Sequence, residues 1–375
     1  MNKILFLCPK INLDKPSGGT LHYLDLTECM MRRYPKLKIV LVAYGKGWKK
    51  NKKNLNIISI PDIETTILKH DANKIDRLNK MIEEISPDCI YYRTEPFEDF
   101  PIHIKSNNPK IIEIGYNLFA KPYDIPWHIS LLWPLRNALL HRWLNDAVNK
   151  FDCVLVQSIS SENSIMKRIH NKTIRIVMDG ANTKKFKHKN IKSYNMVKIV
   201  FVGNHLKYQG VHLLIEATKY MESKNYKIII IGNYSKFKFP KSENIRFEGF
   251  LSNEKAIRIL EKSDIGVAPY LEAKNEPYGF YPIKIFEYMA AGLAVVATDT
   301  EWNREIVKNG ENGILFEENN AKDLARKLDM LIENKTALER IKKTSIRYSK
   351  KHDWSNRSEE IIEIFNDIWN NKRVL

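Results

Sequence analysis

Short apolar runs alternate with amphipathic segments along the first half of the chain. These runs are rich in β-branched residues and bounded by polar turns, as parallel strands covered on both faces are; they begin at residues 3, 38, 56, 89, 110, 153 and 173. Helical periodicity separates several of them, at 19–34 and 73–86 for example. This alternation predicts an α/β domain with a doubly wound parallel sheet over residues 1–182.

A second series of the same kind follows a polar break. Residues 183–196 are basic and without periodicity, which predicts an interdomain linker. We predict a second Rossmann-like domain over residues 197–352. Its strands are expected to begin at residues 197, 226, 244, 264, 293 and 313, and its helical patterns cover 210–223, 253–262, 282–291 and 320–334.

The last segment, 353–375, has a helical pattern with three large aromatic residues, Trp354, Phe365 and Trp369. Ordinary packing, most simply back onto the N-terminal domain, explains them, and a helix that binds a partner is the alternative. A chain of 375 residues exceeds what one hydrophobic core usually organises. Two facing Rossmann-like domains would bind a ligand at the carboxyl ends of their strands, and a phosphorylated ligand suits such a site.

Composition and charge narrow the class of protein. The chain is 43% hydrophobic and 28% charged, which is typical of a soluble globular protein. Its net charge is +17, of which residues 1–190 carry +12 (31 basic minus 19 acidic). Such a charge attracts nucleic acid, an anionic membrane surface or a phosphorylated substrate. The basic residues are dispersed and no nucleic-acid-binding motif accompanies them, so we expect no nucleic acid as a partner.

The cysteines and the N-terminus indicate the compartment. Cys8, Cys29, Cys89 and Cys153 lack the spacing of a metal site or a disulfide framework. The first apolar run is too short for a signal peptide, and no stretch approaches the 18 or so apolar residues of a membrane span. We therefore expect a cytoplasmic protein.

The segment NEPYGFYPIKIFEYMAAGLAVVATD, residues 275–299, carries the most specific chemistry. Its pattern predicts a loop, a helix that begins near Pro282, a turn at Gly292 and a buried strand. The start of such a helix offers unpaired N–H groups to a diphosphate, and Gly279 lets the backbone approach closely. Glu287 can accept both hydroxyls of a ribose. An ordinary solvated helix residue is the alternative for Glu287.

This segment resembles the donor-binding signature of the retaining GT-B glycosyltransferases known as group 1 or family 4. The resemblance implies two Rossmann-like domains facing across a cleft, and transfer of a sugar from a nucleotide-diphosphate donor. It implies that the acidic residue matching Glu287 binds the donor ribose while the loop before it contacts the diphosphate and the sugar. The donor-binding residues that it implies here are Gly279, Phe280, Tyr281, Pro282, Ile283, Lys284 and Glu287. Many members have a second glutamate eight residues earlier, where this chain has Gly279; Glu276 is the nearest substitute.

A second resemblance covers residues 201–217, FVGNHLKYQGVHLLIEA, which are similar to the strand, loop and helix that open the family's C-terminal domain. Asn204 and Gln209 stand where an Arg and a Lys commonly bind the donor phosphates, and we predict Asn204 as a donor-binding residue. Some branches use a lysine placed as Lys207 is, so we predict that Lys207 neutralises the phosphates and that it and Glu287 carry the catalysis. An exposed loop lysine is the alternative.

In the first half the resemblance places a glycine pair, Gly18 and Gly19, on the diphosphate side of the cleft. The histidine that the family often has near the end of the fifth strand is absent, and Gly115 lies there, followed by Tyr116 and Asn117. We take Tyr116 and Asn117 as candidates for the acceptor side. His22 and Arg93 are further cleft candidates, with purely structural roles as the alternative.

Residues 121–143 place Trp127, Trp133 and Trp143 among leucines and basic residues. An amphipathic stretch of this kind suits a membrane interface and a lipid-linked acceptor. A helix packed into the N-terminal domain explains the same pattern.

Together these features predict a retaining, hexosyltransferase-type enzyme with a UDP- or GDP-linked sugar as co-substrate. The acceptor would be a glycan or a lipid-linked molecule of surface polysaccharide or glycolipid synthesis, and the protein would be peripheral at the inner membrane face. No Asp-x-Asp stands in a matching position, so we expect neither a metal nor another cofactor. The alternative is a catalytically inactive GT-B scaffold or nucleotide-binding subunit. A dehydrogenase is excluded because no Gly-x-Gly-x-x-Gly follows a predicted strand.

Overall fold

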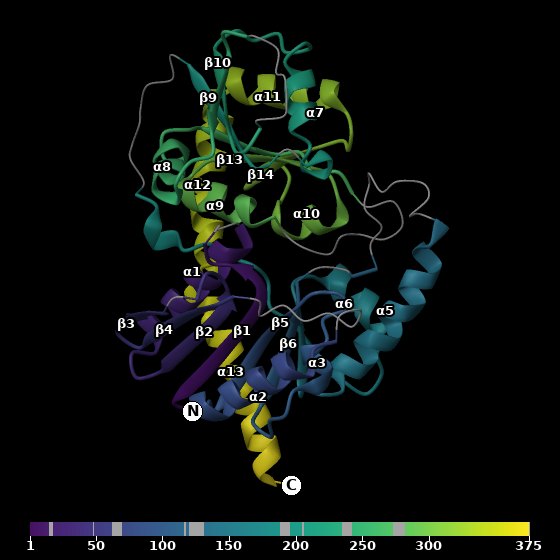
Figure 1. The fold of residues 1–375 in the computed structure, drawn as a ribbon. Coiled ribbons are helices and arrows are strands. Elements are labelled where there is room, and N and C mark those ends of the chain that lie inside the picture. The colour runs from purple at the N-terminus through teal and green to yellow at the C-terminus, as the bar shows by residue number, and fades with distance from the viewer. Residues whose placement is uncertain are drawn as a thin grey trace.

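The computed structural model describes residues 1–14, 18–47, 49–61, 70–115, 118–119, 131–187, 196–204, 206–234, 242–272 and 282–374. Within these ranges the chain forms two α/β domains, stacked one above the other in Figure 1. The fold class predicted from the sequence, two Rossmann-like domains, is confirmed.

The N-terminal domain is built on an eight-stranded sheet with the order β3-β4-β2-β1-β5-β6-β7-β8. All its pairs are parallel except β3 with β4. The seven predicted strands are present. The prediction missed β3, because its sequence KKNK is exposed and has no apolar residue. The strands are β1 (Lys3–Asn12), β2 (Lys38–Tyr44), β3 (Lys49–Lys52), β4 (Leu55–Ile60), β5 (Cys89–Thr94), β6 (Lys110–Ile114), β7 (Cys153–Val156) and β8 (Thr173–Ile176).

Helices cover both faces of this sheet. Because successive side chains of a strand point to opposite faces, Ile4 and Phe6 of β1 pack on the side of α1, while Leu5 and Leu7 pack on the side of α2 and α5. Because both faces of the sheet are buried, the strand sequences are continuous runs of apolar residues. The described helices of the domain are α1 (Gly18–Arg33), α2 (Ala72–Ile85), α3 (Phe100–His103), α5 (Trp133–Val148) and α6 (Ile159–Met166).

The C-terminal domain repeats the arrangement on a six-stranded parallel sheet with the order β11-β10-β9-β12-β13-β14. Its strands are β9 (Val197–Val202), β10 (Tyr226–Ile231), β11 (Ile245–Gly249), β12 (Ile265–Ala268), β13 (Ala294–Thr298) and β14 (Gly313–Phe316). Its helices are α7 (Val211–Ala217), α8 (Asn253–Leu260), α9 (Ile283–Ala291), α10 (Glu301–Ile306), α11 (Ala321–Glu333) and α12 (Lys335–Lys351), with single 3-10 turns η1 (Thr183–Lys185) and η2 (Lys207–Gln209). The helix predicted over 210–223 ends at Ala217, earlier than expected.

Two chain segments cross between the domains side by side. Ala181 N–H donates to the carbonyl of His352 (3.0 Å), and Trp354 N–H donates to the carbonyl of Ala181 (3.2 Å). A Cβ atom on Gly180 would lie 2.3 Å from the His352 carbonyl oxygen, so only glycine fits this crossing. Phe186, inside the predicted linker, is buried in the core of the C-terminal domain, so that part of the predicted linker is packed. Residues 188–195 lie outside the described ranges.

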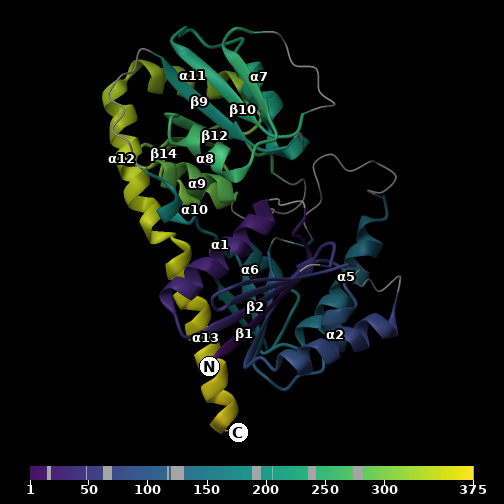
Figure 2. The same ribbon diagram turned by 60° about the vertical axis from the view of Figure 1, so that its left-hand side comes forward.

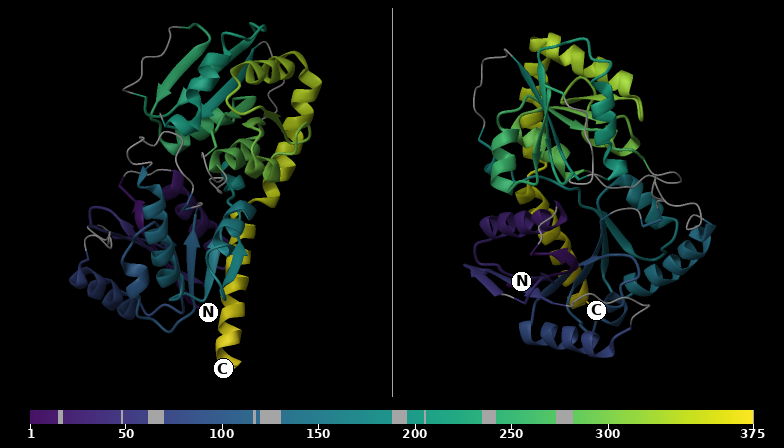
Figure 3. Two further views of the ribbon diagram at one scale, coloured as in Figure 1. Left: turned by 90° about the vertical axis from the view of Figure 1, so that its right-hand side faces the viewer. Right: turned by 45° about the horizontal axis from the view of Figure 1, so that its top comes forward.

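The second crossing leads into α13 (Trp354–Val374), which runs down the N-terminal domain against α1. Figures 2 and 3 show α12 and α13 as one yellow column along both domains. Trp354 and Phe365 are buried in the same cluster as Ile4 and Phe6 of β1. The aromatic residues of the tail therefore pack inside the protein.

All four cysteines are buried and unpaired. Of the helices in the described part of the chain, none combines the length and the apolar character that crossing a bilayer requires.

Candidate active site

The loop from Gly203 to Gly210, which follows β9, is fixed at the carboxyl ends of three strands. The Tyr234 hydroxyl, beyond the end of β10, donates to the carbonyl of Gly203 (2.8 Å). Gly210 has a φ of 70°, and a Cβ atom there would lie 1.7 Å from the carbonyl oxygen of Pro269, just after β12. Ligands of open α/β sheets bind at this edge, so the loop is held where a donor would sit.

Gln209 closes this loop from inside. Its Oε1 atom accepts a hydrogen bond from the backbone N–H of Asn204 (2.9 Å). Gln209, at the place where the resemblance implies a phosphate-binding lysine, therefore has a structural partner here. Asn204 and Lys207 are exposed, Lys207 within the turn η2. The phosphate-binding role of Lys207 stays a prediction.

Helix α9 is anchored under the same loop. The Tyr288 hydroxyl accepts from the N–H of Val202, the last residue of β9 (2.9 Å). Pro282 precedes the first turn, and Gly292, with a φ of 80°, ends the helix as predicted. The Lys284 side chain reaches the loop at Gly203, and Glu287 lies near Asp25 and Lys185, toward the N-terminal domain. Ile283 is half-buried, and Gly279, Phe280 and Tyr281 lie outside the described residues.

Lys284 places a cation beneath the loop. Its Nζ atom is buried and has no hydrogen-bond partner among the residues that the structure describes. It lies 4.8 Å from the ring centroids of both Phe201 and Tyr270. Burial lowers the pKa of Lys284 to about 7, and the nearby Glu287 opposes this shift. A buried ammonium without a hydrogen-bond partner among the described residues is costly, which makes Lys284 a candidate for binding an anion.

Glu287 lies one turn further along α9 and faces the other domain. Burial raises the pKa of Glu287 to about 7, and the second cause is the carboxylate of Asp25 on α1. Asp25 itself forms an ion pair with Lys185, which follows the first crossing. Glu287 forms no hydrogen bond or ion pair with another described residue. The carboxylate is therefore free for a ligand held between the two domains.

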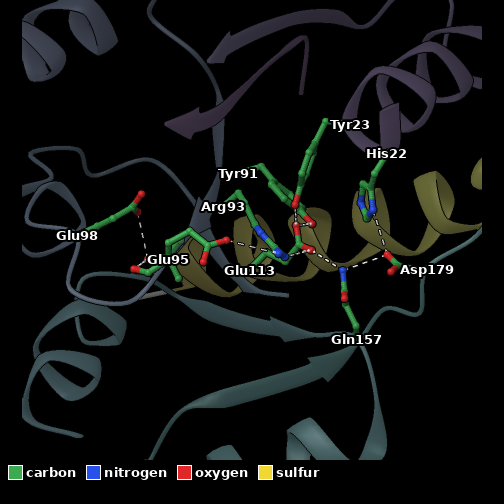
Figure 4. Close-up of polar contacts among 10 residues, drawn as sticks. His22, Tyr23, Tyr91, Arg93, Glu95, Glu98, Glu113, Gln157 and Asp179 are labelled. Atoms are coloured by element: carbon green, nitrogen blue, oxygen red, sulfur yellow. Dashed lines mark hydrogen bonds and ion pairs between the residues drawn. The ribbon is translucent and has the colours of Figure 1, made fainter. Parts of the chain in front are cut away.

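A buried polar network occupies the N-terminal side (Figure 4). The carboxylate of Glu113 on β6 accepts hydrogen bonds from Tyr23 (2.5 Å), Tyr91 (2.6 Å), Arg93 (2.8 Å) and Gln157 (3.1 Å). Burial alone would raise the pKa of Glu113, but the Arg93 guanidinium and the other donors hold it below its usual value. The network joins α1, β5 and β6 to the end of β7.

The network continues to the first crossing. Gln157 Nε2 donates to Asp179 (3.0 Å), and His22 Nδ1 lies 3.1 Å from the same carboxylate oxygen. Arg93 fills the space beside Gly115, where a Cβ atom would come within 1.6 Å of its guanidinium. His22 and Arg93, which the sequence offered as cleft residues, are thus engaged in this network. Tyr116 and Asn117, the acceptor-side candidates, lie outside the described residues.

Sequence reasoning missed Glu113, Gln157 and Asp179. A signal was present, because KIIEI places one glutamate inside a strand predicted to be buried on both faces. Gly18 and Gly19 form the start of α1, and Thr20 beside them donates to the carbonyl of Asn12 (3.1 Å) at the end of β1. Their contact with a diphosphate stays a prediction.

In the aromatic stretch at 121–143, Trp143 agrees with the alternative of a helix packed into the N-terminal domain. Trp143 is buried in the core and donates to the carbonyl of Glu98 (2.6 Å), so it belongs to the inner face of α5. Trp133 is half-buried, with the Arg136 guanidinium 4.4 Å from its ring, and Trp127 lies outside the described residues. The exposed apolar residues here are instead four leucines, exposed by 55–71%: Leu131 and Leu132 just before α5, and Leu135 and Leu139 on its outer face.

Comparison with known proteins agrees with this geometry. Residues 182–348 match the family described as glycosyl transferases group 1. An uncharacterized glycosyltransferase of Methanocaldococcus jannaschii is 24% identical over 354 residues, which are 93% of this chain and 94% of the relative. The N,N'-diacetylbacillosaminyl-diphospho-undecaprenol alpha-1,3-N-acetylgalactosaminyltransferase of Campylobacter jejuni is 23% identical over 46% of this chain and 45% of its own.

Solved structures show the same architecture over the whole chain. Sucrose-phosphate synthase from Thermosynechococcus elongatus superposes with a TM-score of 0.78 at 12% identity, covering 99% of this chain and 100% of that one. HepE of Anabaena, solved with UDP and glucose, gives 0.71 at 16% identity, covering 98% and 100%. These structures show the GT-B fold, as predicted, and the family match supports a glycosyltransferase. More particularly, residues 182–348 are the part of the chain that matches the family glycosyl transferases group 1.

Proposed function

We propose that the protein transfers a sugar from a nucleotide-diphosphate donor to a glycan or lipid-linked acceptor, with retention at the anomeric carbon. The observation that carries the proposal is the pair Lys284 and Glu287. One turn of α9 presents an ammonium beside Gly203 and a carboxylate near Asp25, neither with a hydrogen-bond partner among the described residues. An ammonium suits a diphosphate, and a carboxylate suits the two hydroxyls of a ribose. UDP is the first nucleotide to test, because HepE was solved with it.

In this proposal the protein acts mainly through fixed charges. When the bond between the anomeric carbon and the diphosphate oxygen breaks, negative charge grows on the leaving oxygen. The ammonium of Lys284, the N–H groups at the start of α9 and the predicted Lys207 stabilise that charge. The acceptor hydroxyl then forms the new bond on the face that the diphosphate leaves, and its proton passes to the departing diphosphate oxygen. We expect this charge stabilisation to need no metal.

The acceptor proposal rests on the outer face of α5. Leu135 and Leu139 are spaced by four residues and so share one face of α5, Leu131 is exposed just before the helix, and Arg142 is exposed on the next turn. Figure 1 places α5 at the outer edge of the N-terminal domain. This half of the chain carries +12 of the net charge. Exposed leucines beside basic residues suit the interface of an anionic membrane. The name of the Campylobacter jejuni relative includes a lipid-linked acceptor, diphospho-undecaprenol.

A catalytically inactive scaffold is the second candidate. Gly279 in place of the first glutamate, and Gln209 with a structural partner, favour it. It predicts nucleotide binding without transfer or hydrolysis of the donor.

The donor proposal is tested by calorimetric titration of UDP and GDP into the wild type, Glu287→Ala and Glu333→Ala. Glu333 is exposed at the end of α11, so its variant is the control for a lost surface charge. One nucleotide should bind the wild type and the control but bind Glu287→Ala at least tenfold more weakly. Equal affinity in all three proteins would remove Glu287 from the donor site. Release of UDP or GDP from its sugar then separates the enzyme from the scaffold.

The membrane proposal is tested by sedimentation with vesicles of phosphatidylglycerol or phosphatidylcholine. The wild type should sediment with the anionic vesicles only. Leu135→Glu/Leu139→Glu should remain in solution, and Phe250→Glu, which changes an apolar residue that is 72% exposed on the other domain, should behave as the wild type. Equal sedimentation of the three proteins would contradict the role of α5.

A further inference from the structure

Three side chains of the N-terminal domain converge outside the donor site. His70 Nδ1 lies 2.5 Å from one carboxylate oxygen of Asp99, and His103 Nε2 lies 3.1 Å from the other. The two imidazole rings have their centroids 5.5 Å apart and are tilted by 57° to each other. One ligand atom from each of the three residues lies within 4.8 Å of the others.

The scaffold around this cluster is fixed by contacts that do not involve the three side chains. Asp99 and His103 are four residues apart around α3, so they share one face. The buried Asn79 of α2 donates to the carbonyl of His103 (3.1 Å) and accepts from the N–H of Lys105 (2.8 Å), which joins α2 to α3. His70 directly precedes Asp71, which caps the start of α2 by accepting from Lys74 N–H (3.1 Å). The cluster therefore joins the start of α2 to α3.

The three side chains combine one buried carboxylate with two imidazoles that an ion can reach from solvent. The Asp99 side chain is 5% exposed, whereas those of His70 and His103 are 53% and 43% exposed. A carboxylate in the protein wall is already desolvated, and the imidazoles leave a path from solvent. Two imidazoles and one carboxylate form a ligand set that Zn²⁺ takes, with water in the fourth position.

The distances agree with this chemistry. Zn²⁺ binds nitrogen and carboxylate oxygen at about 2.0–2.2 Å. Two ligands of one tetrahedral ion therefore lie about 3.4 Å apart, and His103 and Asp99 stand close to that separation already. His70 Nδ1, 2.5 Å from Asp99, would have to move about 0.9 Å further away to reach this separation, through a rotation of its half-exposed ring. We propose that His70, Asp99 and His103 form a binding site for a divalent transition-metal ion, with Zn²⁺ the best match, which ties α2 to α3.

This site is separate from the proposed glycosyl transfer, since Lys284 and Glu287 stand on the other domain. The expectation that glycosyl transfer needs no metal concerns the donor site and not this cluster. The metal site can therefore fail while the donor proposal holds, and the reverse.

The test uses the full chain after dialysis against a chelator. ZnCl₂ is titrated by calorimetry, and CoCl₂ is followed through the visible absorption of four-coordinate Co²⁺. We expect one ion per chain for the wild type and for His170→Gln, a control at an exposed histidine outside the cluster. His70→Gln and His103→Gln should bind at least tenfold more weakly and lose the four-coordinate absorption.

Two results would overturn the site: no saturable binding by the wild type, or unchanged affinity in both His70→Gln and His103→Gln. Several weak sites that ignore both substitutions count as the second result. Thermal melting of the metal-free proteins shows whether each variant folds. If His103→Gln does not, His70→Gln decides the matter, because His70 lies ahead of α2 and its ring is exposed.

Discussion

Lys284 Nζ lies 2.7 Å from the point where a Cβ atom would stand on Gly203. The Oε1 atom of Gln209 lies 2.3 Å from the same point. Gly203 therefore leaves room for the ammonium from α9 and for the side chain that closes the loop.

Gly203→Ala should weaken donor binding by tenfold or more, because the added methyl group displaces Lys284 or opens the bond from Asn204 to Gln209. It should also lower the free energy of unfolding by about 1–3 kcal/mol, as overpacking does. Calorimetric titration of UDP and urea denaturation measure the two effects. Gly310→Ala is the control: its φ of 77° strains any other residue, but nothing lies within 4 Å of the new atom. It should lose stability and keep donor affinity. Unchanged affinity in Gly203→Ala would separate the loop from the donor.

Lys284→Met should weaken donor binding without lowering the free energy of unfolding. Charge-assisted hydrogen bonds to a diphosphate are worth about 1–3 kcal/mol, so UDP should bind roughly 10- to 100-fold more weakly. The free energy of unfolding should stay the same or rise, because an apolar side chain replaces a buried ammonium with no hydrogen-bond partner among the described residues. Lys343→Met, at an exposed position on α12, should change neither quantity by much. A large loss of stability with normal UDP binding would make Lys284 a structural residue.

Lys284 and Glu287 should also make the free energy of unfolding depend on pH. The pKa of Glu287 is raised from 4.5 to about 7, so the folded state keeps its proton longer and stability falls as pH rises between those values. The pKa of Lys284 is lowered from 10.5 to about 7, so stability rises with pH from about 7 toward 10.5. Urea denaturation from pH 5 to 9 should therefore show that the free energy of unfolding of Glu287→Gln rises relative to that of the wild type up to about pH 7. A difference that is constant with pH would contradict the raised pKa.

Much of the fold could be predicted because the strands are buried on both faces. Periodicity alone located thirteen of the strands. It missed β3 because Lys49–Lys52 pairs only with β4, at the edge of the sheet, and buries no side chain. The length of α7 could not be predicted, because residues beyond Ala217 have helical spacing but turn away toward β10. Local pattern indicates that a segment can be helical, whereas tertiary contacts decide where the helix ends.

In the candidate site, too, a local motif predicts some residues, whereas tertiary contacts decide the burial and charge of their side chains. Glu287 and Lys284 were predicted as donor residues from one local motif. The burial of Lys284 depends on the loop at Gly203, some eighty positions earlier in the chain, so no local pattern reports its charge state. The same holds for Trp143, whose amphipathic surroundings suited a membrane face although packing against α3 turns it inward.

Glu113 should be among the most sensitive positions in the N-terminal domain. Its removal leaves the Arg93 guanidinium and two tyrosine hydroxyls in a buried space without their acceptor. Breaking a buried charge pair in this way costs about 3–5 kcal/mol, so Glu113→Ala should lower the free energy of unfolding by that amount in urea. Glu359→Ala is the matched control, because it breaks the exposed ion pair with Arg33 and should cost less than about 1 kcal/mol.

The pH dependence of Glu113 supplies an independent check on the same network. Because its donors hold the pKa of Glu113 below the usual 4.5, the ionised carboxylate stabilises the folded state above pH 4.5, and this contribution is lost as pH falls through the lowered pKa. Glu113→Gln keeps the shape of the side chain but cannot ionise. The stability difference between wild type and Glu113→Gln should therefore shrink on acidification below pH 4.5, while the difference for Glu359→Ala stays small throughout. A difference that persists unchanged at low pH would mean that packing, and not the buried charge of Glu113, holds α1 and β5 to β6.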